Sequence, residues 1–163
     1  MNKSTQKTVF SNKTDNWSTP KAFFDKLNKI YGPFDLDPCA DSVNATCEKY
    51  FTEKDDGLLQ DWSGHCVFVN PPYSKTKDWI KKAYTESLKE NTKVVMLIAS
   101  RTDTKYFHEY VFKHASHILF IKGRLKFGGS KNSAPFPSAV VVFDSKHYHN
   151  LATKQQITTI DRV

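Results

Sequence analysis

The sequence has 163 residues, of which 39% are hydrophobic and 25% charged, which is the size and composition of one ordinary globular domain. From this length we expect no separate target-recognition domain, and from the lack of a long apolar run we expect no membrane span, secretory signal or bulk disorder. The three cysteines form an odd set without paired spacing, so we expect reduced thiols rather than disulfides or a zinc ribbon.

The charge is distributed unevenly along the chain. The formal net charge is +7, and it divides into +3 over residues 1–21, −5 over residues 22–62 and +9 over residues 63–163. An acidic stretch followed by a basic one suits a cationic ligand held early in the chain and a polyanion held later.

The chain begins with polar residues that show no periodicity. Residues 1–14 are therefore expected to be a flexible arm in front of a single domain over residues 15–163. Apolar residues at helical spacing then predict a helix over residues 20–30, behind the capping hydroxyls of Ser18 and Thr19.

Short apolar runs predict strands in the remainder of the chain, and helical spacing predicts two further helices. The strands are expected at 34–37, 49–52, 65–69, 94–99, 118–121 and 139–143, and the helices at 79–88 and 106–111. The glycine- and proline-rich segment 123–137 contains no helical pattern, which favours an antiparallel pair on either side of it. The predicted fold is therefore α/β, with a mostly parallel sheet and one reversed strand near its edge.

Asn70-Pro71-Pro72-Tyr73 follows a predicted buried strand, the position where open α/β sheets bind ligands. A ring-conjugated amine is a poor nucleophile because its lone pair is delocalised. Hydrogen bonds from its two N–H groups to Asn70 Oδ1 and the Pro71 carbonyl would favour attack on an electrophilic methyl group. Pro72 would stiffen the loop, and Tyr73 would stack on a base flipped out of the duplex. The alternative is that the four residues only end a strand.

Further blocks occur in a fixed order around this tetrapeptide. They are Trp17 to Pro20, Phe34 to Ala40, Asp56 to Leu58 with Trp62, Arg101 to Thr104 with Phe107, Gly123 to Phe127, and Ala134 to Ser138. Together the blocks resemble the small, phage-type DNA N6-adenine methyltransferases, which are Dam-like enzymes. The resemblance implies an abbreviated class I, Rossmann-like fold. It also implies methyl transfer from S-adenosylmethionine to adenine N6 in double-stranded DNA. The expected location is the cytoplasm, or the host cytoplasm if the chain is encoded by a phage.

The resemblance assigns two segments to the cofactor. The methionine part of the cofactor would be contacted by Trp17, Ser18, Thr19 and Pro20, with Thr19 donating to its carboxylate. A plain helix cap is the alternative for this segment. Asp37, with Pro38 and Ala40, would lie beside a cationic part of the cofactor. This chain departs from the glycine-rich loop found there in many such enzymes, and a loop-capping role is the alternative for Asp37.

Other acidic residues are candidates for the rest of the cofactor. Asp55 or Asp56 would accept from the adenine amine of the cofactor, and we expect Trp62 to be a core residue. Only about ten residues separate the first two strands, too few for a full crossover helix. The acid that holds the ribose is therefore left open between Glu48 and Glu53.

The basic half of the chain is expected to supply the DNA surface. Its candidates are Lys75, Arg101, Arg124, Lys126, Phe127 and Phe136. The two aromatic rings would wedge or stack beside the flipped base, with core or hairpin packing as the alternative. The six histidines show no metal-binding spacing, so no metal is expected.

Two other functions are compatible with these residues. One is methylation of another planar amine, in an RNA base or a protein glutamine, and the other is nucleic-acid binding by a relative that has lost the cofactor. The recognition sequence and the oligomeric state stay open.

Overall fold

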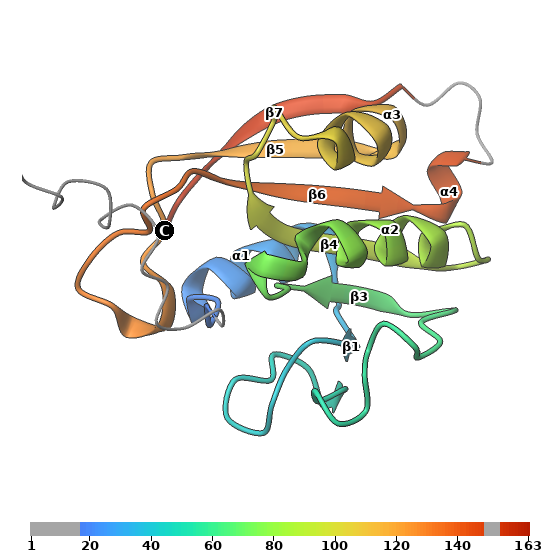
Figure 1. The fold of residues 1–163 in the computed structure, drawn as a ribbon, viewed down its shortest axis with the longest axis horizontal. Helices are drawn as coiled ribbons and strands as arrows, with labels where there is room; N and C mark the ends of the chain where they lie inside the picture. The colour runs from blue at the N-terminus through green and yellow to red at the C-terminus, as the bar shows by residue number, and fades with distance from the viewer. Residues whose placement is uncertain (1–16, 149–153) are drawn as a thin grey trace, which may run out of the picture.

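The structure is a computed structural model that describes residues 17–148 and 154–163, so the predicted arm over residues 1–14 lies outside the described residues (Figure 1). Seven strands of the described part form one sheet in the order β2-β1-β3-β4-β6-β5-β7. They are β1 (Leu36–Asp37), β2 (Lys49–Tyr50), β3 (Cys66–Val69), β4 (Lys93–Ala99), β5 (His117–Lys122), β6 (Ser138–Asp144) and β7 (Gln156–Asp161).

The described part of the chain has the three predicted helices and a short helix over Ser145–Tyr148 that the apolar spacing did not predict. They are α1 (Lys21–Tyr31), α2 (Thr76–Ser87), the π-helical turn η2 (Phe107–Val111) that continues into α3 (Phe112–His114), and α4 (Ser145–Tyr148), with 3-10 turns η1 (Tyr73–Lys75) and η3 (Phe127–Gly129). The predicted cap of the first helix is wrong. Pro20 occupies the N-cap position without a side-chain hydrogen bond, because the Thr19 hydroxyl is used elsewhere.

The predicted sheet direction is confirmed. The pairs β1–β2, β1–β3, β3–β4 and β5–β7 are parallel, whereas β6 runs antiparallel to both β4 and β5. The reversed strand lies third from the edge, because β7 adds a strand outside β5. The apolar patterns did not predict β7, because five of its six residues are exposed and show no strand-like alternation.

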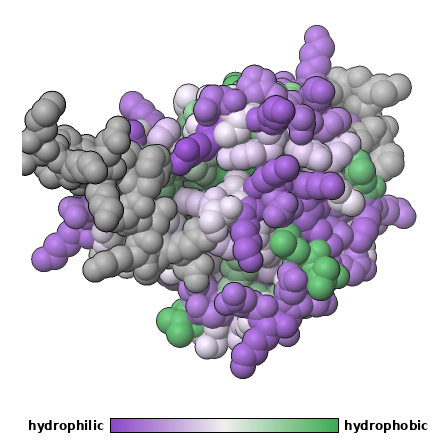
Figure 2. Space-filling view, viewed as in Figure 1, coloured by the Kyte–Doolittle hydropathy of each residue, from purple (hydrophilic) through white to green (hydrophobic). Residues whose placement is uncertain are grey.

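The sheet has an apolar layer on each face because consecutive strand residues point to opposite sides. Val94, Met96 and Ile98 face α2 and the segment η2–α3, whereas Val95 and Leu97 face α1 and the loop between β5 and β6. Figure 1 shows α2 and α3 together on one side of the sheet. On the face drawn in Figure 2, hydrophobic residues form small separate patches in a mostly hydrophilic surface.

The link between β1 and β2 contains turns and no helix, as its length predicted. Because β1, β3, β4 and β5 run in the same direction, their carboxyl ends meet at one edge of the sheet. The amino end of β6 lies at the same edge, since Ser138 pairs with Ala99. Asp37 ends β1, and Asn70, Arg101 and Arg124 follow β3, β4 and β5 within two residues, so the fold brings these four candidates to the same edge.

Candidate functional site

A cavity of about 600 Å³ opens at the carboxyl ends of β1 and β3. Most of the residues predicted to hold the cofactor line it, together with part of the Asn-Pro-Pro-Tyr segment. The lining includes Trp17, Ser18, Thr19, Asp37, Pro38, Ala40, Asp56, Asn70, Pro72 and Lys75. Pro20 and Asp55 are not among the lining residues. The structure thus brings together four parts of the chain, at residues 17–19, 37–40, 56 and 70–75.

Asp37 is a buried carboxylate on the cavity wall, with 4% of its surface exposed. Its Oδ2 accepts from the backbone N–H of Thr46 at 3.1 Å and from the Thr46 hydroxyl at 2.7 Å, and its Oδ1 accepts from the N–H of Cys39 at 3.2 Å. Burial raises the pKa of Asp37, and these hydrogen bonds only partly oppose that shift. No cationic side chain pairs with Asp37 within residues 17–148 and 154–163.

The other carboxylates divide between the cavity and the outer surface. Asp41, Glu53 and Asp56 line the cavity, whereas Glu48 does not. Asp55 is exposed, and hydrogen bonds from Thr52 hold the pKa of its carboxyl below the ordinary value. Among the two pairs of alternatives, the structure therefore places Glu53 and Asp56 at the cavity.

Asn70 joins the cavity to the segment before α1. Its Nδ2 donates to the backbone carbonyl of Trp17 and to Thr19 Oγ1, the latter at 3.0 Å. Its Oδ1 is buried and has no hydrogen-bond partner among the described residues. A buried acceptor without a partner is costly, so this atom is available to a donor from a ligand.

The ring of Tyr73 packs edge-on against Phe136, with centroids 4.9 Å apart, and against Phe127. Trp17 makes edge contacts with the same two phenylalanines. Burial raises the pKa of Tyr73, whose hydroxyl has no hydrogen-bond partner in the described part of the chain. These four rings form an aromatic cluster that connects the segment before α1, the Asn-Pro-Pro-Tyr segment and the loop between β5 and β6.

The basic candidates lie at the same edge of the sheet and are exposed. Lys75 reaches the cavity rim, Arg101 follows β4, and Arg124 and Lys126 lie in the loop after β5. One guanidinium N–H of Arg124 donates to the Ala134 carbonyl across this loop at 3.3 Å.

The two aromatic DNA candidates differ in exposure. Phe127 is 2% exposed, so it is a packed residue, which was the alternative to a DNA contact. Phe136 is partly exposed.

The cavity wall after β2 is fixed by close packing. A Cβ atom on Gly57 would lie 1.9 Å from the Pro38 carbonyl oxygen, so no side chain fits at this position. Trp62 is fully buried, as expected, stacks on Trp79 and donates from its indole N–H to the Gly57 carbonyl at 3.0 Å. Its backbone N–H donates to the carboxylate of Glu86 on α2 at 2.9 Å.

Glu86 is a buried acid, 3% exposed, that binds two lysines. Lys82 donates to it at 2.6 Å and Lys89 at 2.7 Å. Burial raises the pKa of Glu86, but the bonds from both lysines and from Trp62 outweigh burial and bring the pKa below its ordinary value. This network ties the cavity wall to α2.

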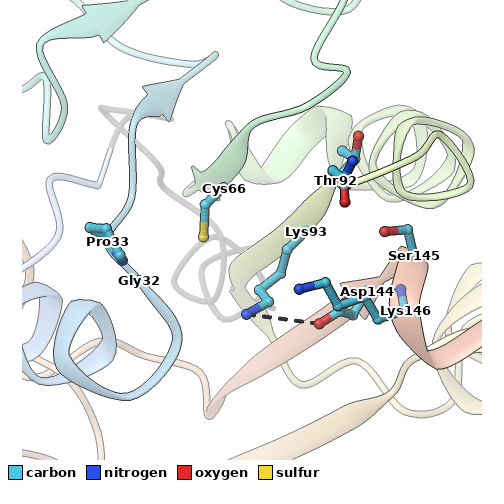
Figure 3. Close-up of a pocket in the computed structure, with 9 residues that line it drawn as sticks. Gly32, Pro33, Cys66, Thr92, Lys93, Asp144, Ser145 and Lys146 are labelled. Atoms are coloured by element: carbon cyan, nitrogen blue, oxygen red, sulfur yellow. Dashed lines mark hydrogen bonds and ion pairs between the residues drawn. The ribbon is translucent and has the colours of Figure 1, made fainter.

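A second cavity, about 200 Å³ in volume, lies at the opposite edge of the sheet. Figure 3 shows Lys93 of β4 facing Asp144 of β6 there, at 3.8 Å, with Cys66 of β3 nearby. This edge holds the amino ends of β3 and β4, whereas open α/β sheets bind ligands at the carboxyl ends.

Sequence reasoning missed Thr46, which also lines the cavity, and it gave Leu58 no role although its block was recognised. Thr46 lies nine positions after Asp37, in a loop without any pattern, so only the folded loop reveals it as the donor to that carboxylate. Within the described residues, no group of histidine, cysteine and acidic side chains is arranged to hold a metal ion, and no helix is long and apolar enough to cross a membrane.

The architecture agrees with the class I methyltransferase fold that the resemblance predicted. It has a mostly parallel sheet with one reversed strand, and a cavity at the strand ends. Residues 6–162 match the family model described as DNA N-6-adenine-methyltransferase (Dam). The chain belongs to this family.

Two phage proteins, each named a DNA N-6-adenine-methyltransferase, are similar to the chain. That of Escherichia phage T1 is 34% identical over 112 residues, which cover 68% of this chain and 46% of that protein. That of Haemophilus phage HP1 is 31% identical over 139 residues, which cover 81% of this chain and 80% of that protein. The match thus spans less than half of the phage T1 protein. A predicted O-methyltransferase from Agrobacterium tumefaciens has a similar structure, with a TM-score of 0.40, 12% identity and coverage of 78% of both chains.

Proposed function

We propose that the protein transfers a methyl group from S-adenosylmethionine to the N6 amine of adenine in double-stranded DNA. The observation that carries this proposal is the unpartnered, buried Oδ1 of Asn70 at a cavity lined by carboxylates. Membership in the DNA N-6-adenine-methyltransferase family supports DNA as the substrate, rather than RNA or protein, and supports an active enzyme rather than a binding protein.

The acidic cavity suits the cofactor, which carries an α-ammonium and a sulfonium group and supplies an electrophilic methyl group when bound. Asp37 offers a buried negative charge that lacks a cationic partner among the described residues. Glu53 would hold the ribose hydroxyls, and Asp56 would accept from the adenine amine. The wall of the site would be completed by Trp17, Ser18, Thr19, Pro38 and Ala40.

The two N–H groups of the target amine would donate hydrogen bonds to Asn70 Oδ1 and to the Pro71 carbonyl. These bonds would favour a pyramidal nitrogen, whose lone pair would attack the methyl carbon as the bond from that carbon to the sulfonium sulfur breaks. The extra proton on the product nitrogen would then pass to water. Pro72 stiffens this loop, and its carbonyl accepts from the N–H of Lys75 at 3.0 Å. Tyr73 would contact the face of the flipped base from within the aromatic cluster.

The DNA backbone would lie along the basic edge of the sheet. Lys75, Arg101 and Lys126 are exposed and suited to phosphate, and Arg124 keeps guanidinium donors beyond the one used within its loop. Phe136 has the partly exposed ring that is suited to contact a displaced base.

Labelled S-adenosylmethionine tests the function directly. The purified protein is incubated with unmethylated duplex DNA, with RNA or with denatured protein, and the modified nucleosides are then identified. We expect label in N6-methyladenine from the DNA arm. Label in another base or in glutamine would contradict the proposal, and so would the absence of transfer when calorimetry shows cofactor binding.

The ionised carboxylate of Asp37 is expected to increase the affinity for the cofactor and to destabilise the protein when no cofactor is bound. A folded-state pKa above the unfolded one means that this carboxyl stabilises the fold at low pH, and that the contribution is lost as the pH rises through the folded pKa. Asp37→Asn should therefore raise the cofactor Kd about tenfold or more. At neutral pH it should leave the free energy of unfolding unchanged within about 1 kcal/mol, because removal of the buried charge offsets the loss of hydrogen bonds that the carboxylate accepts.

Calorimetry and urea unfolding measure these two effects, with Asp25→Asn on the exposed face of α1 as the matched control. Unchanged cofactor affinity in the Asp37→Asn variant would show that the cationic part of the cofactor lies elsewhere.

The basic loop after β5 is expected to make DNA binding sensitive to salt. Each phosphate contact releases counterions, so Lys126→Ala should reduce the slope of log K against log salt concentration by about 1. The exposed Lys113 lies on α3, before the amino end of β5. Lys113→Ala is therefore expected to leave the slope unchanged. Equal slopes for Lys126→Ala and the wild type would exclude this loop from the phosphate contacts.

A further inference from the structure

The partners of Asn70 determine which way its side-chain amide faces. A backbone carbonyl can only accept a hydrogen bond, so the amide atom that faces the Trp17 carbonyl must be the NH₂ group. The same NH₂ donates to Thr19 Oγ1 at 3.0 Å. The two acceptors use both protons of Nδ2 and leave Oδ1 as the buried atom without a partner in the described chain.

We propose that the Trp17 carbonyl and the Thr19 hydroxyl are positioning groups that hold Asn70 Oδ1 toward the target amine and restrict position 70 to a side chain that donates and accepts at once. The proposal rests on the function proposed above, and it assigns Thr19 a role toward the catalytic amide that is separate from contact with the cofactor.

An ionised carboxyl does not meet this requirement. After Asn70→Asp, a carboxylate oxygen would face the lone pairs of the Trp17 carbonyl, without a proton to place between the two oxygens. The protonated carboxyl does meet it, because its O–H donates to the Trp17 carbonyl while its C=O accepts from the amine. Burial and the facing carbonyl should both raise the pKa of the introduced carboxyl.

The expected signature is a pH profile that the wild type lacks. The titratable groups that line the same cavity are Asp37, Asp41, Glu53, Asp56, Cys39 and Lys75, and they are present in both proteins. The introduced group is therefore the difference between the two profiles. Relative to wild type at each pH, the rate of Asn70→Asp should fall about tenfold as the pH rises from about 6 to 8.

Thr19 is tested by a pair of substitutions. Thr19→Val keeps the shape and removes the acceptor, and it should lower kcat about tenfold with a change in the KM for S-adenosylmethionine of less than about threefold. Thr19→Ser restores an acceptor and should recover most of the lost kcat. Thr85→Val, which removes an exposed hydroxyl on α2 that bonds the Lys81 carbonyl, is the control.

Two measurements separate this inference from the function on which it rests. The titration of the introduced carboxyl, followed by ¹³C NMR of the Asn70→Asp protein, does not need catalysis, and a pKa above about 6 supports the proposed orientation even if DNA is not methylated. An ordinary pKa together with a wild-type pH profile would overturn the inference. So would a Thr19→Val variant that changes only the KM for S-adenosylmethionine, because Thr19 would then act on the cofactor alone.

Discussion

Asn70→Ala should abolish methyl transfer and leave the fold intact. The variant removes the acceptor that acts on the amine in the transition state, for which we expect a loss of about 3 kcal/mol or more, a factor of at least about 10² in kcat. Cofactor affinity should change only a few-fold, since Asp37 and the acidic lining are unaffected.

Single-turnover methylation and calorimetry on the same preparation separate the two effects. Thr85→Val serves again as the matched control, because its hydroxyl bonds only within α2. A near-wild-type rate in the Asn70→Ala variant would remove Asn70 from the reaction, whatever the affinity for the cofactor.

Glu86→Ala should have the largest effect on stability. It leaves the N–H of Trp62 and the ammonium of Lys82, whose side chain is 17% exposed, without their buried acceptor. Removal of one partner from such a network costs about 3 kcal/mol in the free energy of unfolding. Because the folded-state pKa of Glu86 is lowered, its contribution is present at neutral pH and is lost as the pH falls through that pKa.

Urea unfolding at neutral pH and in acid tests the size and the sign of this effect. The difference between Glu86→Ala and wild type should shrink as the pH falls. Lys89→Ala is the comparison, because Lys89 is 40% exposed and its loss should cost less than about 1 kcal/mol. Equal costs for the two variants would show that the buried carboxylate is not the centre of the network.

Local sequence patterns were sufficient for most of the fold. The apolar stripe before Gly32 and the buried run before Asn70 identify α1 and β3, because helical and strand spacings bury different sets of side chains. The exposed strand β7 has neither pattern, and its pairing with β5 comes from the tertiary structure.

The site was predictable in its segments but not in its contacts. Asn70 was recognised because it follows a buried strand, the position where open α/β sheets bind ligands. Asp37, which ends the first strand, was assigned by the family resemblance. The Thr19 hydroxyl was predicted to donate to the cofactor, with a helix cap as the alternative, and neither prediction included the hydrogen bond that it accepts from Asn70, 51 positions later. The donors to Asp37 and the partners of Phe127 likewise depend on how loops fold over one another, which no short motif encodes.

The reversed strand β6 has a consequence for how much chain the site requires. Because β5 ends at Lys122 on the site edge and β6 begins at Ser138 on that same edge, the chain between them starts and ends at the edge of the sheet where the cavity opens. A parallel β6 would require a crossover of a dozen or more residues that leads back to the opposite edge. Reversal of one strand thus lets the chain carry a basic loop at the edge of the candidate site without a crossover helix. If the proposed function is correct, this loop is the place to exchange sequences when altered DNA specificity is sought.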